Sequence, residues 1–296
     1  MTTQTMRGAA APAQGTVPPA MPVIAPPVPT LLPEPRPWWG VRTPIPRTRA
    51  LVLVALGLLL PLLGWIALAA SGWVQPVFMP GPGAVLQRMA DWWADGLLED
   101  VAISTLRVVS GWALSALIAL PLGLLIGSFR TVQALLEPLT DFIRYMPAVA
   151  FIPLVMVWVG IDEGAKVAII FIGTFFQMVL MVAEDVRRVP AAQIEAAQTL
   201  GATRGEIIQQ VLVPSAKPAL LDTLRVTMGW AWTYLVVAEL VAASSGLGFA
   251  ILKAQRFLQT DKIFGGILLI GLIGLAIDQL MRLAHRKAFG YLYLRR

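Results

Sequence analysis

Few residues of this 296-residue chain have a side chain suited to covalent or metal chemistry. It has no cysteine, and its single histidine, His285, lies in a basic cluster near the C-terminus. A Ser–His hydrolase needs a histidine beside its nucleophile, and a zinc protease needs His-Glu-x-x-His. Neither pattern occurs within the apolar stretches, and the ATP-binding pattern Gly-x4-Gly-Lys-Ser/Thr is also absent. We therefore expect no metal and no bound cofactor, and an intramembrane enzyme stays only as an alternative.

A second group of polar and small residues lies within or beside long apolar stretches. Ionisable groups there are costly and usually face protein or water. The candidate functional residues of this group are Arg144, Gln177, Trp232, Glu239, Ser244, Gly246 and Gly248. For Trp230, Trp232 and Tyr234, core packing or lipid contact is the alternative.

Two of these candidates carry charge. Arg144 could attract an anion, or it could contact a lipid headgroup. Glu239 is poorly suited to contact an anion, so we expect it to brace an outer gate near Ser244 to Gly248. A structural ion pair or hydrogen bond is the alternative for this carboxylate.

The longest polar stretch, EAAQTLGATRGEIIQQVLVP at 195–214, predicts two short helices. Pro190 can occupy the first position of the first helix, where its missing N–H is not needed. Gly201 suits the left-handed residue that ends this helix.

The second helix of this stretch has its own start and stop signals. Thr203 and Glu206 form a Thr-x-x-Glu capping box at its beginning. Pro214 and Pro218 are expected to end it and to turn the chain back. We therefore predict a stiff helix–turn–helix elbow, for which a solvated surface helix pair is the alternative.

The rest of the chain is apolar enough to place this elbow at a membrane. Charged residues make up 14% of the chain, whereas about 25% is usual in soluble domains. Stretches of about 20 apolar residues can cross a bilayer as helices. The expected fold is therefore an all-α polytopic membrane protein of about six spans, at 51–70, 102–127, 138–160, 166–184, 226–243 and 263–281. Pro147 and Pro153 should kink or interrupt the third span.

Charge and proline content organise the chain further. Most of the 23 Lys and Arg residues fall on one side if both termini are cytoplasmic, as the positive-inside rule requires. That orientation puts a long loop, 185–225, in the cytoplasm. Residues 1–50 are rich in proline and are expected to form a disordered cytoplasmic tail, with a partner-binding role as the alternative. The transmembrane domain is expected over 51–296.

The elbow carries a resemblance to a known family. The elbow resembles the EAA motif of ABC importer permeases at Glu195-Ala196-Ala197, at Gly201 and over the run Val211 to Pro214. The family form ends Ile-x-Leu-Pro, and valine replaces both aliphatic residues here. Four further segments look like the branch that imports nitrate, sulfonates and taurine: STLRVVSGW from Ser104, PLGLLIGS from Pro121, RYMPAVAFIPLVMVWVGI from Arg144 and AELVAASSGLGF from Ala238. The likeness covers about 75–290.

This resemblance implies a type I importer permease fold in the bacterial inner membrane and a small anionic solute such as nitrate, a sulfonate or taurine. It implies a separate cytoplasmic ATPase that carries ATP and magnesium, a periplasmic or lipid-tethered substrate-binding protein, and a homodimer of permeases. It assigns Glu195, Ala196, Ala197, Gly201 and Pro214 to ATPase coupling, and the capping box of Thr203 and Glu206 is expected to stiffen the coupling elbow. In such a permease, the candidates for the translocation path or gate are Arg144, Gln177, Trp232, Glu239, Ser244, Gly246 and Gly248. A self-contained secondary transporter is an alternative, although its usual internal repeats are not evident.

Overall fold

The computed structural model describes residues 45–293, apart from the side chains of 241, 242 and 293. Most of the predicted proline-rich tail, 1–50, therefore lies outside the described residues. The chain divides into two compact units, 1–58 and 59–296, and the boundary falls inside the first helix. In the first unit the described part is the start of that helix, which begins at Arg47. The following description concerns the second unit.

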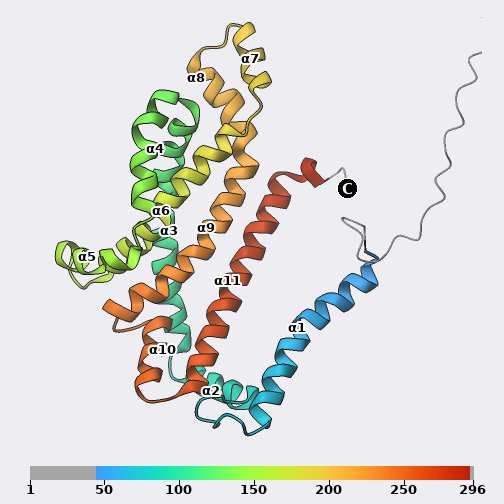
Figure 1. The fold of residues 1–296 in the computed structure, drawn as a ribbon, viewed down its shortest axis with the longest axis vertical. Helices are drawn as coiled ribbons and strands as arrows, with labels where there is room; N and C mark the ends of the chain where they lie inside the picture. The colour runs from blue at the N-terminus through green and yellow to red at the C-terminus, as the bar shows by residue number, and fades with distance from the viewer. Residues whose placement is uncertain (1–44, 294–296) are drawn as a thin grey trace, which may run out of the picture. The chain divides into compact units, whose positions relative to one another are not determined.

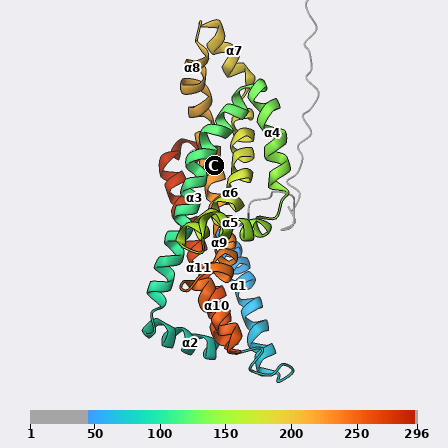
Figure 2. The same cartoon turned by 90° about the vertical axis from the view of Figure 1, so that its left-hand side faces the viewer.

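The described residues form helices joined by short turns (Figure 1). The elements are α1 (Arg47–Ala70), α2 (Pro82–Ala94), α3 (Leu97–Ser128), α4 (Arg130–Arg144), η1 (Ala148–Phe151), α5 (Ile152–Val159), α6 (Glu163–Arg187), α7 (Ala191–Thr199), α8 (Arg204–Glu206), η2 (Ile207–Leu212), α9 (Val213–Ala242), α10 (Leu247–Arg256), α11 (Thr260–Ala288) and η3 (Gly290–Tyr293). Within the second unit, α7 and α8 lie at one end, and α2 and α10 lie at the other (Figure 2).

Four described helices, α1, α3, α6 and α11, are long and apolar enough to cross a membrane, and these match four of the predicted spans. The predicted span 138–160 is interrupted, as its prolines led us to expect. It consists of the end of α4 followed by η1 and α5, and the two parts are bent by 88°. Pro147 explains the break, because its extended backbone and missing N–H interrupt the helical ladder. This bent pair counts as a fifth span if its two parts cross together.

The predicted span 226–243 is the second half of α9, which already begins inside the predicted loop. The expectation that Pro214 and Pro218 end a helix is wrong, since both lie within α9. The preceding segment, η2, is a π-helix, in which the Val213 N–H bonds to the carbonyl of Ile208, five residues back. Proline lacks an N–H and crowds the carbonyl four residues before it. The wider π turn just before Pro214 eases both problems, so the helix continues.

The centre of the second unit is the packing of α3 against α6. Small residues recur at every fourth position of α3 along this contact, at Gly111, Ser115, Ala119, Gly123 and Gly127. A Cβ added at Gly123 would lie 2.6 Å from Val182, and one at Gly127 would lie 2.7 Å from a backbone carbonyl of α6. Small residues let helices approach closely in lipid, where contact rather than the hydrophobic effect holds them together.

Candidate functional site

The elbow, defined as 191–206, turns at Gly201 as the sequence predicts. Gly201 has φ +82, in the left-handed region. Its N–H bonds to the Gln198 carbonyl at 2.9 Å, and the Ala202 N–H bonds to the Ala197 carbonyl at 3.0 Å. This pair of bonds is the Schellman motif, which satisfies the last carbonyls of α7. Pro190 lies one residue earlier than predicted, because it precedes α7 instead of occupying its first position.

The predicted capping box is present on the other side of the turn. The Glu206 N–H donates to Thr203 Oγ1 at 3.4 Å, and the Thr203 N–H donates to Glu206 Oε2 at 2.7 Å. The Thr203 hydroxyl also donates to this carboxylate at 2.7 Å. These hydrogen bonds lower the pKa of Glu206 below its ordinary value, and the bond from the Thr203 backbone N–H contributes most. The carboxylate is therefore charged at neutral pH, where it accepts both hydrogen bonds from Thr203.

One side of the elbow is anchored, and the other is open. A buried apolar cluster lies beneath it and consists of Val186, Val189, Ile207, Leu212 and Ala216. Ala197 packs against this cluster, whereas Glu195, Ala196 and Leu200 are exposed, Leu200 to 88%. The exposed side of α7 thus presents an acidic, a small and a large apolar side chain, at Glu195, Ala196 and Leu200.

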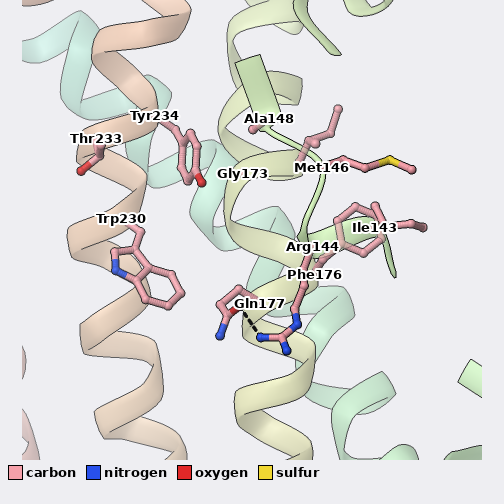
Figure 3. A pocket seen from close by; sticks show the side chains of 11 residues that line it. Ile143, Arg144, Met146, Ala148, Gly173, Phe176, Gln177, Trp230, Thr233 and Tyr234 are labelled. Carbon is pink, nitrogen blue, oxygen red and sulfur yellow. Dashed lines mark hydrogen bonds between the residues drawn. The ribbon is translucent and has the colours of Figure 1, made fainter. Parts of the chain in front are cut away.

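A cavity of about 250 Å³ lies between the end of α4, η1, α6 and α9 (Figure 3). It brings together two of the predicted path residues, since Arg144 lies 3.5 Å from Gln177 Oε1 through its Nη1. Arg144 also pairs with Asp141 at 2.9 Å and donates to the Tyr145 hydroxyl at 3.1 Å. The contact with Gln177 is the longest of the three. An incoming ligand would therefore replace that contact most easily.

Aromatic side chains form the opposite wall of this cavity. Trp230 and Tyr234 of α9 form this wall, whereas Phe176 of α6 lies on the side of Arg144 (Figure 3). Thr233 also lines the cavity. Trp232 does not, because it is 4% exposed and belongs to the apolar core. Residues 230 and 234 are one helical turn apart and share a face, whereas residue 232 points away from that face. The structure thus places Trp232 in the packing role that the sequence offered as its alternative.

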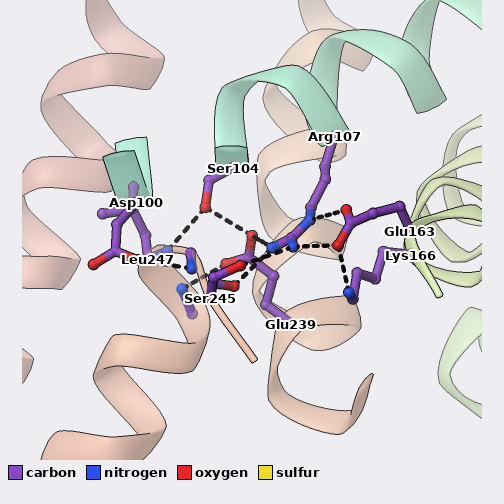
Figure 4. A network of polar contacts seen from close by, with 10 residues as sticks. Asp100, Ser104, Arg107, Glu163, Lys166, Glu239, Ser245 and Leu247 are labelled. Carbon is purple, nitrogen blue, oxygen red and sulfur yellow. Dashed lines mark hydrogen bonds and ion pairs between the residues drawn. The ribbon is translucent and has the colours of Figure 1, made fainter. Parts of the chain in front are cut away.

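The other predicted path residue, Glu239, lies apart from this cavity, in a polar network at the α9–α10 junction (Figure 4). Its carboxylate is fully buried. Oε1 accepts from Ser104 Oγ and from Arg107 Nη1, both at 2.7 Å. Oε2 accepts from the Gly248 N–H at 2.7 Å. All three contacts come from donor groups, so both oxygens of this buried side chain have hydrogen-bond partners inside the protein.

Arg107 is the centre of this network. Its Nη1 also donates to the Ser245 carbonyl at 2.8 Å, while Nε and Nη2 form a two-pronged pair with Glu163, each at 2.6 Å. Lys166, 4% exposed, donates to the same glutamate at 2.6 Å. Arg107 therefore joins α3, α6, α9 and the turn before α10. We call the set Asp100, Ser104, Arg107, Glu163, Lys166, Glu239 and 245–248 the polar network.

The predicted gate residues have different roles in the turn before α10. Gly246 has φ +105, and its N–H donates to Asp100 at 2.9 Å. A Cβ at Gly246 would collide with the Glu239 carboxylate and lie 2.7 Å from Arg107. Gly248 donates to Glu239, whereas Ser244 is exposed. Both glycines are thus required by the close approach of the turn to the buried charges.

The residues that the sequence reasoning missed are the partners of Glu239. Arg107 lies inside the predicted span 102–127, and Ser104 lies one turn before it. A buried charge in a span needs an opposite charge. Matching the intraspan arginine to the intraspan glutamate would have suggested this pair. Among the described residues, no group of three His, Asp or Glu side chains is placed to hold a metal ion.

Comparison with known proteins identifies the family of this chain. The family described as binding-protein-dependent transport system inner membrane component matches residues 119–290. A probable ABC transporter permease protein of Brucella melitensis is 39% identical over 225 residues, which cover 76% of this chain and 90% of that protein. The taurine transport system permease protein of Escherichia coli is 32% identical over 252 residues, which cover 83% of this chain and 91% of that protein.

A solved structure shows the same fold. A chain of the MetNI methionine ABC transporter, in an inward-facing conformation, superimposes with a TM-score of 0.53 at 24% identity. The match covers 63% of this chain and 94% of that one. The fold of the second unit is therefore that of an ABC importer permease.

Proposed function

The chain belongs to the family of binding-protein-dependent transport system inner membrane components, and we propose that it carries small organic anions, such as sulfonates, through the cavity beside Arg144. It is the inner-membrane permease subunit of an ABC importer, and ATP is hydrolysed by a separate ATPase subunit. Its partners are that ATPase and a substrate-binding protein. Membership in this family argues against both alternatives, the secondary transporter and the intramembrane enzyme.

The composition of the cavity wall carries the substrate proposal. Arg144 supplies a guanidinium, and Gln177, Thr233 and Tyr234 supply an amide and two hydroxyl groups. No carboxylate is among the described residues that line it. A planar guanidinium matches oxyanions in charge and in donor geometry. The likeness to a taurine permease supports a sulfonate in particular.

The elbow is proposed to be the contact with the ATPase. The coupling residues would be Glu195, Ala196, Ala197, Gly201, Thr203, Glu206 and Pro214. Their shared features support this role: an exposed tip, two caps that fix the turn, and an apolar anchor beneath. ATP with magnesium on the partner would drive the elbow, and α9, which continues from it, would transmit the movement.

The remaining parts of the proposal concern assembly and orientation. Two copies of the permease would surround one path, and both termini would be cytoplasmic. The distribution of Lys and Arg supports the orientation. Exposed apolar side chains on α5, among them Val157 and Trp158, are suited to contact either a second copy or lipid.

The decisive experiment is uptake by the complete transporter. We would reconstitute the permease with its ATPase and binding protein in proteoliposomes and measure ATP-driven uptake of taurine. Arg144→Ala should reduce uptake by about tenfold or more, which corresponds to one lost charge-assisted contact. Arg130→Ala, at the other end of α4, is the matched control and should have no effect. Uptake of neutral or cationic solutes in place of anions would contradict the proposal, as would full activity of Arg144→Ala.

A further inference from the structure

Gly173 of α6 and Tyr234 of α9 meet at the wall of the cavity (Figure 3). A Cβ added at Gly173 would lie 2.5 Å and 2.7 Å from the two Cδ atoms of the tyrosine ring, and it would collide with Cγ as well. Real Cβ atoms do not approach other atoms this closely. The ring therefore occupies the space that any other residue at 173 would fill.

This contact cannot be relieved by a small adjustment of the tyrosine. Cγ is the base of the ring, one bond from Cβ, so the whole ring must move when it is displaced. Away from the cavity, the tyrosine packs against the apolar core cluster to which Ala231, Leu235 and Ala238, all fully buried, belong. Displacement would therefore drive the ring toward the open side, which is the cavity, or force α9 away from α6. Closely packed interiors resist the second change.

We propose that Gly173 and Tyr234 act as a pair that sets the size of solute the cavity admits. The glycine seats the ring against α6, and the seated ring leaves the space beside Arg144 and Gln177 open. This inference rests on the proposed function, because it takes the cavity to be the solute path. It assigns a specificity-determining role to a residue that has no side chain of its own.

The absence of native cysteine gives a direct test. Thr233→Cys places a single thiol in the cavity wall of the full-length protein. The rate of its modification by anionic 2-sulfonatoethyl methanethiosulfonate reports whether a sulfonate can enter. Adding Gly173→Ala should slow modification by about tenfold, a typical size for two residues in direct contact. Adding Tyr234→Ala to that variant should restore the rate.

Gly229→Ala is the matched control, because Gly229 lies on α9 beside Trp230 and a Cβ there meets no atom within 4 Å. It should leave the modification rate unchanged. An equal rate in Gly173→Ala, or a failure of Tyr234→Ala to restore it, would overturn the proposal. Tyr234→Ala alone, without a change at 173, should speed modification by the bulky fluorescein-5-maleimide. This single variant keeps the test decisive if Gly173→Ala fails to fold. An unchanged rate of maleimide modification in Tyr234→Ala would contradict the proposed role of Gly173 and Tyr234.

Transport measurements separate this inference from the proposed function. In proteoliposomes with the ATPase and binding protein, Gly173→Ala should reduce taurine uptake, and the double variant should recover it. If the unmodified complex imports no anion, the proposed function fails, whatever the thiol assay shows. If it imports taurine and Gly173→Ala does so equally well, the size-setting pair fails, and the proposed function stands.

Discussion

The elbow and the polar network are both rigid, but they are held in opposite ways. The elbow is exposed, and its bonds join residues three to five positions apart, such as Thr203 with Glu206 and Ala202 with Ala197. The polar network is buried at its centre, Arg107 and Glu239, and opens to the surface at Glu163. Its bonds span 132 positions between Arg107 and Glu239 and 146 between Asp100 and Gly246. One is stiffened by local backbone caps, and the other by charges brought together by the fold.

This difference separates two kinds of stability. Breaking one side of a buried charge pair leaves an unpaired charge and threatens the whole fold. Losing a cap at the surface loosens only the turn that the cap closes. We therefore expect changes in the network to affect assembly of the protein and changes in the elbow to affect its connection to the ATPase.

The largest effect is expected for Arg107→Leu. This change leaves Glu239 buried without its cation and should cost about 3–5 kcal/mol of unfolding free energy. Thermal unfolding of the detergent-purified protein, followed by size-exclusion chromatography, would measure the loss. Arg88→Leu breaks a partly exposed pair with Asp261 and serves as the control, at about 1 kcal/mol or less. Equal losses in both variants would show that the network is no stronger than a surface ion pair.

A smaller and more local effect is expected at Gly201. Alanine in the left-handed conformation costs about 1–2 kcal/mol, whereas asparagine tolerates it better. Coupling, measured as ATPase activity stimulated by the binding protein, should therefore fall in the order glycine, asparagine, alanine, with aspartate also impaired. Thermal unfolding should change little. Gly205→Ala, four residues away and inside α8, is the control and should retain coupling.

If Gly201→Ala couples normally, the left-handed turn does not set the elbow's angle. If it unfolds the protein as Arg107→Leu does, the distinction between local and global stiffness is wrong.

The smallest effect is expected at Glu206. Glu206→Ala removes half of the capping box, whereas Glu206→Gln keeps it. Hydrogen–deuterium exchange of the elbow amides should speed up by a few-fold in the first variant and little in the second. Because the pKa of Glu206 is lowered in the folded state, the carboxylate contributes stability above its ordinary pKa and loses it as pH falls through the lowered value. Exchange corrected for its intrinsic pH dependence should therefore be constant between about pH 6 and 8. A change within that range would contradict the lowered pKa.

The same contrast explains what the sequence could predict. The turn at Gly201 and the Thr203–Glu206 box depend on neighbours along the chain, so their residue types identify them. Four spans follow from apolar length in the same way. The partners of Glu239 come from α3 and from the start of α10, and nothing local in the sequence pairs them.

The errors have related causes. Pro214 carries a local stop signal, but the π turn before it lets the helix continue. The interruption of the span 138–160 follows from its prolines, but the 88° turn at the break does not. Helical periodicity separates Trp232 from Trp230 and Tyr234, but only the packing of α9 on α6 decides which face meets the cavity. In all three cases the outcome depends on the backbone path and on tertiary packing, which the local residue types do not determine.

The small residues along α3 have a consequence for measuring motion. Gly111, Gly123 and Gly127 bring α3 so close to α6 that no side chain could be inserted between them, and Ser115 bonds to Thr174 across the contact at 2.7 Å. Such a pair has no room to slide or separate without losing contact along its length. Two spin labels, one on each helix, should therefore report an unchanging distance throughout the transport cycle. The distance between α3 and α6 would therefore serve as an internal reference for measuring displacements of α9 and the elbow.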